Sequence, residues 1–287
     1  MSSQALPLTR STTAATPVAT NAATKPSFVN TVLSEAMRLT RRGFLGSGLV
    51  LVAGLTLLVT VITFVAASDT AEGDGFELMT SQLEAARGLV ATIEGSANLL
   101  GLVVLSLGAI AVATDYATGL IRLLVQAEPR RWRLVVGKLV ALAGLTVGAA
   151  ALATVVGVVA SPVMATISDI STGAWTDGVV WTVTSTFLNL ALGLFVWVTI
   201  GFTIAVVTRS TAAAIAGGIG YIVLFENLIG LVSETVVAWL PGSAITAIVA
   251  GGNETQDYRT ALALSIGYAL LGAVVSLAVF QRRDITA

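Results

Sequence analysis

Seven charged residues lie within one stretch of 24, DYATGLIRLLVQAEPRRWRLVVGK, which runs from Asp115 to Lys138. Only 11% of the whole chain is charged. Uncharged apolar runs flank the stretch on both sides. Acidic and basic side chains at this density can form ion pairs or bind a charged partner. The stretch therefore indicates recognition, at a place between two apolar segments.

A second candidate for chemistry is Glu226, which interrupts the apolar run YIVLFENLIG. An ionisable group inside a membrane-length segment is costly and commonly serves an ion or substrate pathway. Two interpretations stay open. Glu226 lines a translocation pathway, where it attracts a cation or titrates, or it lies toward an outer interface where the helix breaks.

The chain contains no cysteine and no histidine. This composition excludes disulfides, thiolate chemistry, zinc sites of the Cys/His type and any histidine general base. We therefore expect no catalytic residues, no metal and no cofactor in this chain, and we do not expect an enzyme.

The elements that must position these residues are membrane spans. The 287 residues are 55% hydrophobic with a mean hydropathy of +0.91, whereas about a quarter of the residues in a soluble domain are charged. A helix needs roughly 20 apolar residues to cross a bilayer. Uncharged runs of that length predict an all-α membrane protein with six transmembrane helices, near 44–67, 95–114, 139–160, 179–207, 211–232 and 260–280.

The loops between these spans differ in charge. Of the 15 Lys and Arg residues, all but Arg87 and Arg259 fall on one side of the predicted membrane, and most acidic residues fall on the other. Cytoplasmic loops carry an excess of Lys and Arg. We expect a multi-pass protein of the plasma (inner) membrane with both termini cytoplasmic, and the Asp115–Lys138 stretch becomes its main cytoplasmic loop.

Residues 1–27, rich in Ser, Thr, Ala and Pro, are expected to form a disordered cytoplasmic N-terminus. The next segment has Phe28, Val32, Leu33, Ala36 and Leu39 at near-helical spacing, with Glu35 and Arg38 elsewhere on the wheel. It predicts a short helix along the inner interface, or a plain extension of the first span. The sequence TRRGFLG that follows imitates a twin-arginine export signal, but its apolar run is long and five more spans follow, so we interpret the two arginines as anchors.

Within the charged stretch, Asp115 can cap a helix start, and Ile121, Leu124 and Val125 then share one face. Pro129 ends that helix and can begin the next one. The sequence thus predicts a short amphipathic helix, a corner and a basic segment leading into the third span. Basic residues and a tryptophan at an inner interface are also ordinary anchors.

The order of residues in this loop resembles the cytoplasmic loop of type 2 ABC exporter permeases, which often reads E-Y-x-x-G-T-x-x-x-L-L-x-x-P-x-x-R-x-x-x-x-x-K. Leu120 stands where that family usually has Thr. The apolar segment WLPGSAITAIVAGG at 239–252, too short to span, looks like the family's re-entrant outer segment. The matching positions in the loop are Asp115, Tyr116, Gly119, Leu123, Leu124, Pro129, Arg131 or Trp132, Gly137 and Lys138.

The resemblance implies that the loop helix is a coupling helix that docks in a groove of a separate ABC nucleotide-binding ATPase. ATP and Mg would be held by that partner, since this chain has no phosphate-binding loop. It also implies a second permease copy or a homologous permease, contact with membrane lipids and no nucleic acid. The residues implied in coupling are Asp115, Tyr116, Gly119, Leu123, Leu124, Val125, Pro129, Arg131 and Lys138.

Two alternatives belong to other functional classes. One is an ion-coupled secondary transporter that works through Glu226, although the sequence shows one broken segment and no twin of it. The other is a non-transporting membrane scaffold or immunity protein.

Overall fold

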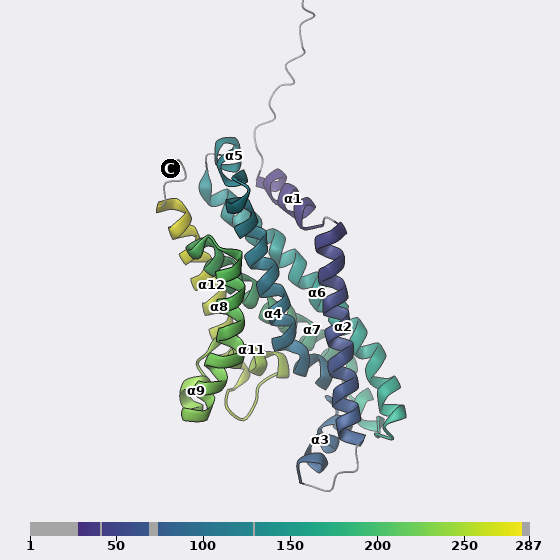
Figure 1. The fold of residues 1–287 in the computed structure, drawn as a ribbon. Coiled ribbons are helices and arrows are strands. Elements are labelled where there is room, and N and C mark those ends of the chain that lie inside the picture. The colour runs from purple at the N-terminus through teal and green to yellow at the C-terminus, as the bar shows by residue number, and fades with distance from the viewer. Residues whose placement is uncertain (1–27, 41, 69–73, 129, 283–287) are drawn as a thin grey trace, which may run out of the picture.

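The computed structural model describes residues 28–40, 42–68, 74–128 and 130–282, and the regular elements in these ranges are helices (Figure 1). Within them, six helices are long and apolar enough to cross a membrane, as the apolar runs predict. One of the six, the segment Thr211–Val232, consists of several shorter helices. The other five are continuous: α2 (Arg42–Ser68), α4 (Gly88–Ala117), α6 (Arg131–Ile167), α7 (Val179–Thr208) and α12 (Tyr258–Arg282).

The helices extend beyond the uncharged runs that predict them. α6 has 37 residues and is therefore about 55 Å long, against about 30 Å for the hydrocarbon core of a bilayer. It includes Lys138, and α4 includes both Glu94 and Asp115. These charged residues continue the helices because each is paired with a residue of opposite charge.

The composite span consists of α8 (Thr211–Gly220), a π-helical turn (Tyr221–Phe225) and α9 (Glu226–Val232). π-turns are rare and often mark functional positions. Here the turn ends at Glu226, the one acidic residue of the span.

α4 and α7 form the centre of the bundle, with α2 on one edge and α8 and α9 on the opposite edge (Figure 1). The largest side chains of the core, among them Trp197, Phe202 and Leu105, are fully buried where α4 and α7 meet. The core therefore fixes α4 and α7 against each other, and the two candidate sites, around Asp115 and around Glu226, lie at opposite ends of the bundle.

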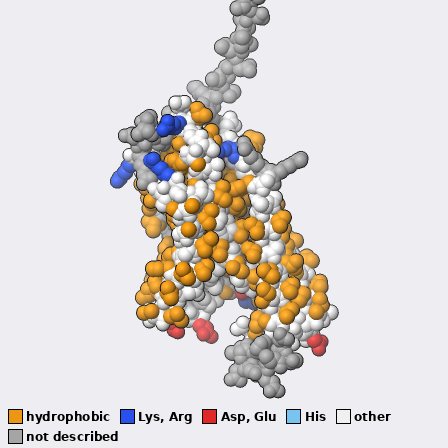
Figure 2. Space-filling model, viewed as in Figure 1, with side chains coloured by type: hydrophobic (Ala, Val, Ile, Leu, Met, Phe, Trp, Pro, Cys, Tyr) orange, Lys and Arg blue, Asp and Glu red, His pale blue; other side chains and the backbone are white. Residues whose placement is uncertain are grey.

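The two ends of the bundle differ in elements and in charge. α1 (Phe28–Leu39) and α5 (Leu120–Ala127) lie at one end, and α3 (Asp74–Glu84) at the other. Figure 2 shows Lys and Arg gathered at the α5 end, Asp and Glu at the α3 end, and hydrophobic side chains between them. This surface is that of a multi-pass membrane protein.

The predicted re-entrant segment is also helical. α11 (Pro241–Ala250) has ten residues, about 15 Å, which reaches through roughly half of a bilayer. It packs against α12, α7 and α4, and most of its side chains are buried. The short α10 (Glu234–Val237) connects α9 to it.

Some expectations need correction. Asp115 does not start a helix, because it lies in the last turn of α4; α5 begins after Gly119, whose φ of 69° is in the left-handed region that favours glycine. Trp175 and Trp181 flank the start of α7, where tryptophans commonly anchor a span at the membrane interface, but Trp175 is buried and donates its indole N–H to the Leu83 carbonyl at 2.7 Å. Trp181 is 76% exposed, as an anchor would be.

Other expectations lie outside the described residues. These are the disorder of residues 1–27, the anchoring by Arg41 and by the side chain of Arg42, and the helix-ending role of Pro129.

Candidate functional site

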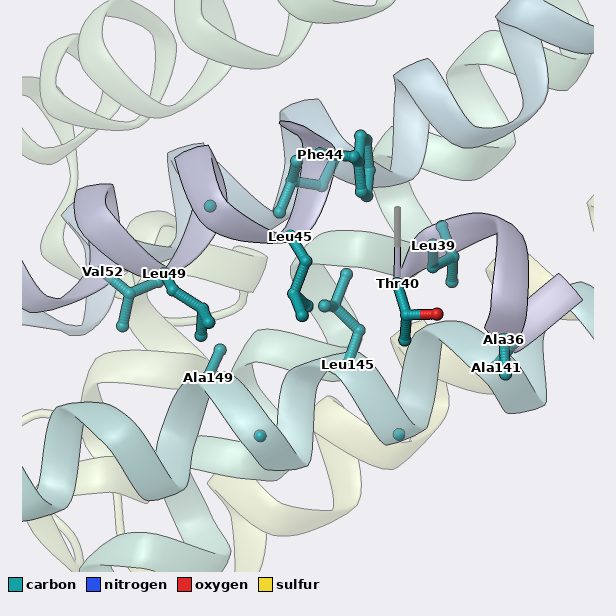
Figure 3. A pocket seen from close by; sticks show the side chains of 14 residues that line it. Ala36, Leu39, Thr40, Phe44, Leu45, Leu49, Val52, Ala141, Leu145 and Ala149 are labelled. Carbon is teal, nitrogen blue, oxygen red and sulfur yellow. The ribbon is translucent and has the colours of Figure 1, made fainter. Parts of the chain in front are cut away.

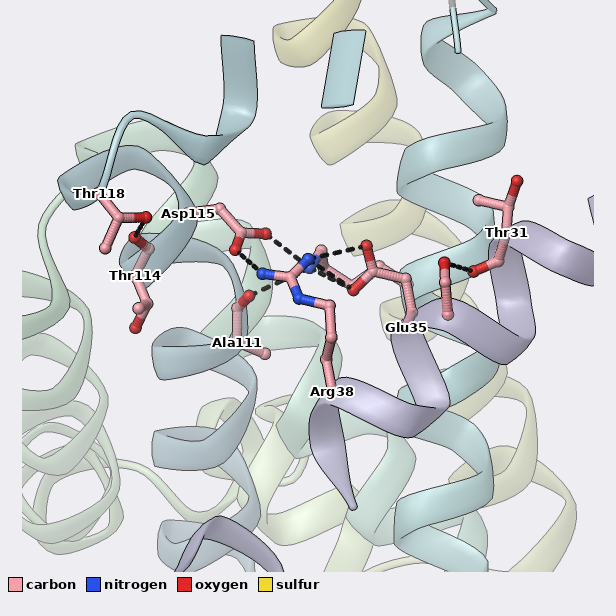
Figure 4. A network of polar contacts seen from close by, with 9 residues as sticks. Thr31, Glu35, Arg38, Ala111, Thr114, Asp115 and Thr118 are labelled. Carbon is pink, nitrogen blue, oxygen red and sulfur yellow. Dashed lines mark hydrogen bonds and ion pairs between the residues drawn. The ribbon is translucent and has the colours of Figure 1, made fainter. Parts of the chain in front are cut away.

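Four charged side chains from α1, α4 and α6 form ion pairs with one another at the α5 end of the bundle, and Figure 4 shows the contacts of Glu35, Arg38 and Asp115. We call Glu35, Arg38, Asp115 and Lys138 the charge cluster. Lys138 Nζ lies 2.7 Å from carboxylate oxygens of both Glu35 and Asp115. Arg38 binds Asp115 and also Glu35, the latter at 3.2 Å. The cluster links α1 to α4 and α6.

The charges of this cluster balance, two against two. The side chains of Asp115, Glu35 and Lys138 are 1%, 3% and 7% exposed, and that of Arg38 is 29% exposed. Burial alone would lower the pKa of Arg38, but its hydrogen bond to Asp115 and the charge of Glu35 raise the pKa, so the guanidinium stays protonated. Buried charges are tolerated when they are paired in this way, and removal of one partner is strongly destabilising.

The charge cluster sets the orientation of α1. Its Glu35 and Arg38 face the bundle, while Val29, Leu33 and Met37 form an exposed apolar stripe. Of the apolar residues that the sequence placed on one face of this helix, Leu39 is buried and Ala36 packs against the core, whereas Leu33 is exposed. An outward apolar stripe is typical of a helix in a membrane interface, and Figure 1 shows α1 as a separate helix at an angle to α2 rather than its extension.

α5 has the predicted amphipathic face, but this face packs on its own bundle. Ile121 is 6% exposed, and Leu124 and Val125 are half-buried against the core. Leu123, on the outer face, is 62% exposed. A partner that docks on α5 would therefore meet Leu123 with the exposed Arg122 and Gln126, whereas Leu124 and Val125 hold the helix in place.

The other loop residues implied in coupling also contact their own chain. The guanidinium of Arg209, which follows α7, lies 5.6 Å from the Tyr116 ring. Arg131 Nη1 donates to the Gln281 carbonyl in the last turn of α12 at 3.4 Å. Together with Asp115 and Lys138 in the charge cluster, these residues tie the ends of four spanning helices together.

Sequence reasoning missed Glu35 and Arg38 as members of this site. The available signal was their spacing of three on one helix, which permits an ion pair. Their partners lie 77 and 103 residues away along the chain, and a single sequence does not pair residues at that distance.

At the other end of the bundle, Glu226 caps the re-entrant helix α11. Its Oε1 accepts the backbone N–H of Gly242 at 2.8 Å, and hydrogen bonds from Tyr221 and the Ser243 backbone reach the same carboxylate. The first N–H groups of a helix lack intrahelical partners and carry partial positive charge. Leu240, at the N-cap position, offers no side-chain acceptor. Glu226 of the composite span supplies the acceptor instead.

Gly242 makes this cap possible. A Cβ at this position would overlap with Oε2 of Glu226. The residue must therefore be glycine for the carboxylate to approach the backbone this closely.

An arginine completes the arrangement at the C-terminus of α11. Arg87 Nη2 donates to the Val249 carbonyl at 3.4 Å and to Thr186 Oγ1 at 3.4 Å, and it is paired with Glu94. A cation at a helix C-terminus complements the helix dipole. α11 is thus held by a carboxylate at its start and a guanidinium at its end, and the sequence did not single out Arg87 or Glu94.

Two further polar side chains support this region. Asn98 Nδ2 donates to Thr246 Oγ1 of α11 at 3.0 Å, and the Tyr258 hydroxyl donates to Asn189 Oδ1 at 2.9 Å. Both asparagines thus form interhelical hydrogen bonds. No group of three or more acidic residues close enough to hold a metal ion occurs within the described ranges.

A family model described as "Protein of unknown function (DUF2705)" matches residues 76–286, from α3 to the C-terminal end of α12. The match covers well over half of the chain, and the chain belongs to this family. No curated protein matches it.

Proposed function

We propose that this member of the DUF2705 family is the transmembrane permease subunit of an ATP-driven ABC exporter. It forms the translocation pathway and couples to a separate nucleotide-binding subunit on the cytoplasmic side of the plasma membrane. The observation that carries the proposal is α5, a short helix between two spanning helices at the cation-rich end, in a loop whose residue order resembles that of type 2 exporter permeases.

The placement of α5 suits the transmission of force. Its inner face packs on the bundle through Ile121, Leu124 and Val125, so a push on its outer face reaches α4 and α6 directly. The charge cluster ties these two helices to α1. A rigid-body motion of a docked partner would therefore move several helices together, which is how domain motions commonly switch a site between states.

In the proposed transporter, the partner subunit binds the nucleotide. The Gly137–Lys138 pair superficially resembles part of a phosphate loop, but Lys138 is held in the charge cluster. A Cβ on Gly137 would meet Thr31 of α1 at 3.1 Å, so the glycine serves the close contact of α1 with α6. By resemblance, two permease chains and two ATPase subunits, with ATP and Mg, complete the transporter.

Ion-coupled transport through Glu226 receives less support. The carboxylate is 9% exposed and its oxygens bind the start of α11. This contact favours a positioning role for Glu226 within the permease.

The test is affinity purification of the tagged chain in mild detergent, with mass spectrometry and an ATPase assay of the eluate. Leu123→Asp places a charge on the exposed face of α5, and Leu123→Met is the matched control because it keeps an apolar side chain there. We expect wild type and Leu123→Met to retain a Walker-motif ATPase and Leu123→Asp to retain at least tenfold less. Equal recovery with Leu123→Asp, or no ATPase with wild type, would contradict the proposal.

A further inference from the structure

An apolar groove of about 220 Å³ opens between α1, α2, α4 and α6, at the α5 end of the bundle (Figure 3). Its walls include Leu45 and Leu49 of α2, with Leu145 and Ala149 of α6 across from them. An apolar cavity of about 150 Å³ is enough to bind a small hydrocarbon such as benzene. The groove is therefore large enough for part of a hydrocarbon chain.

Two glycines of α6 create much of this space. Gly144 and Gly148 form a GxxxG motif, a pattern that commonly permits close contact with another helix. Both line the groove, and a Cβ on either would meet nothing within 4 Å. Within the described residues the motif leaves room instead of bringing a helix close.

A polar hollow of about 180 Å³ adjoins the groove, and Leu39 and Phe44 line both. All four members of the charge cluster line this hollow. Arg38 is the most exposed of them, at 29%. A guanidinium that reaches the surface is well suited to bind a phosphate oxygen.

The dimensions match one leaflet of a bilayer. Along α2 the lining runs from Phe44 to Val52, which corresponds to about 12 Å of helix. Half of a hydrocarbon core is about 15 Å. The exposed apolar stripe of α1 marks the interface at the polar end of the groove.

We propose that this groove and the adjoining hollow form a binding site for one glycerophospholipid of the leaflet at the α5 end. One acyl chain lies in the groove over Gly144 and Gly148, and the phosphate lies beside Arg38. The site shares the charge cluster with the proposed coupling path, but the outer face of α5 takes no part in it. Its test measures lipid retention and not ATPase recovery, so the two proposals can fail separately.

The test measures phospholipid retention by native mass spectrometry after the purified chain is incubated with palmitoyl-oleoyl phosphatidylglycerol and then washed in detergent. In the Gly144→Leu/Gly148→Leu double variant, side chains fill the groove. Gly54→Leu is the control, since Gly54 lies on α2, has open space around its Cβ and does not line the groove. We expect one phospholipid on wild type and on Gly54→Leu, and at least tenfold less on the double variant.

If the double variant does not fold, the single variant Gly148→Val replaces it in the experiment. Gly148→Val should also lower phospholipid retention. Equal retention by wild type and the folded groove variants would overturn the proposal. For the headgroup, Arg38→Gln should lower the retention of phosphatidylglycerol at least tenfold more than that of dioleoylglycerol, which lacks phosphate and so reports any change in the groove itself. Arg38→Lys keeps the charge as a control.

Inorganic phosphate separates the two possible sources of the anion. If the site holds a lipid phosphate, 10-fold more inorganic phosphate than phospholipid should leave lipid retention unchanged. Displacement of the phospholipid by phosphate, or an unchanged affinity of Arg38→Gln for phosphatidylglycerol, would contradict the assignment of the headgroup.

Discussion

Glu226 shows how one side chain can hold a whole element. A buried carboxylate needs compensation, and the N-terminal N–H groups of α11 provide it. The sequence identified Glu226 as unusual and left open whether it lines a pathway or marks a break in the helix. Its partner, Gly242, lies 16 residues further along the chain on a helix that folds back, and no local pattern pairs the two.

Replacement of Gly242 by alanine tests this contact. The added Cβ would overlap with Glu226 Oε2 and push the carboxylate off the helix start. We expect the free energy of unfolding to fall by about 1–3 kcal/mol, the cost of a buried hydrogen-bonding group left without its partner. The measurement is reversible denaturation in mixed detergent micelles.

Gly217→Ala is the control for that experiment, because Gly217 lies in α8 and a Cβ there meets nothing within 4 Å. This change should be neutral or slightly stabilising, since alanine favours a helix over glycine. The same loss of stability in both variants would show that the Glu226 cap is not responsible.

At the scale of elements, the charge cluster determines how α1 lies on the bundle. Lys138 serves two carboxylates at once, one from α1 and one from α4. Its replacement by methionine leaves Glu35 and Asp115 with Arg38 as the remaining cation of the cluster. Loss of one partner from a buried ion pair typically costs 3–5 kcal/mol, so we expect a destabilisation of about that size.

A double-mutant cycle on Glu35→Gln and Lys138→Met isolates the link between α1 and α6. We expect an interaction free energy of about 0.5–3 kcal/mol, as for residues in one salt-bridge network. The matched pair Glu128→Gln and Arg133→Met, whose charged atoms are 3.5 Å apart, should give a smaller value. If the effects of the Glu35 and Lys138 changes on the free energy of unfolding are additive, the ion pair between them does not fix α1 on the bundle.

Much of this arrangement of elements was predictable. The six apolar runs predict the six membrane-length helices, because hydropathy and length are properties of the local sequence. That Ile121, Leu124 and Val125 share one face of α5 follows from the helical period in the same way. The structure confirms both predictions. The sequence did not predict that this face packs on the chain's own bundle, because the apolar face suited a partner's groove equally well.

The expectations that fail depend on distant partners. Asp115 looked like a helix start because an acid commonly caps one, but its ion pairs let α4 continue past it. Gly144 and Gly148 looked like a packing motif, but whether a helix lies over them is decided by the position of α2. Trp175 is buried because Phe64 and Leu83 come from other elements to cover it.

The whole molecule has two specialised ends joined by an apolar bundle. One end is cation-rich and carries α1, α5 and the charge cluster. The other end carries α11, which Glu226 binds at its start and Arg87 at its C-terminus. If the protein is a permease driven by a partner ATPase, the first end faces the cytoplasm and meets the partner at α5. The second end then faces outward.

Site-directed cross-linking tests this claim most directly, because the chain has no cysteine and single cysteines can be placed at will. Leu123→Cys, on the outer face of α5, is compared in cells with Glu254→Cys, an exposed position near the C-terminus of α11. We predict that a bifunctional maleimide joins Leu123→Cys to a Walker-motif ATPase and that an impermeant external maleimide labels Glu254→Cys alone. External labelling of Leu123→Cys, or its failure to cross-link to any ATPase, would contradict the account.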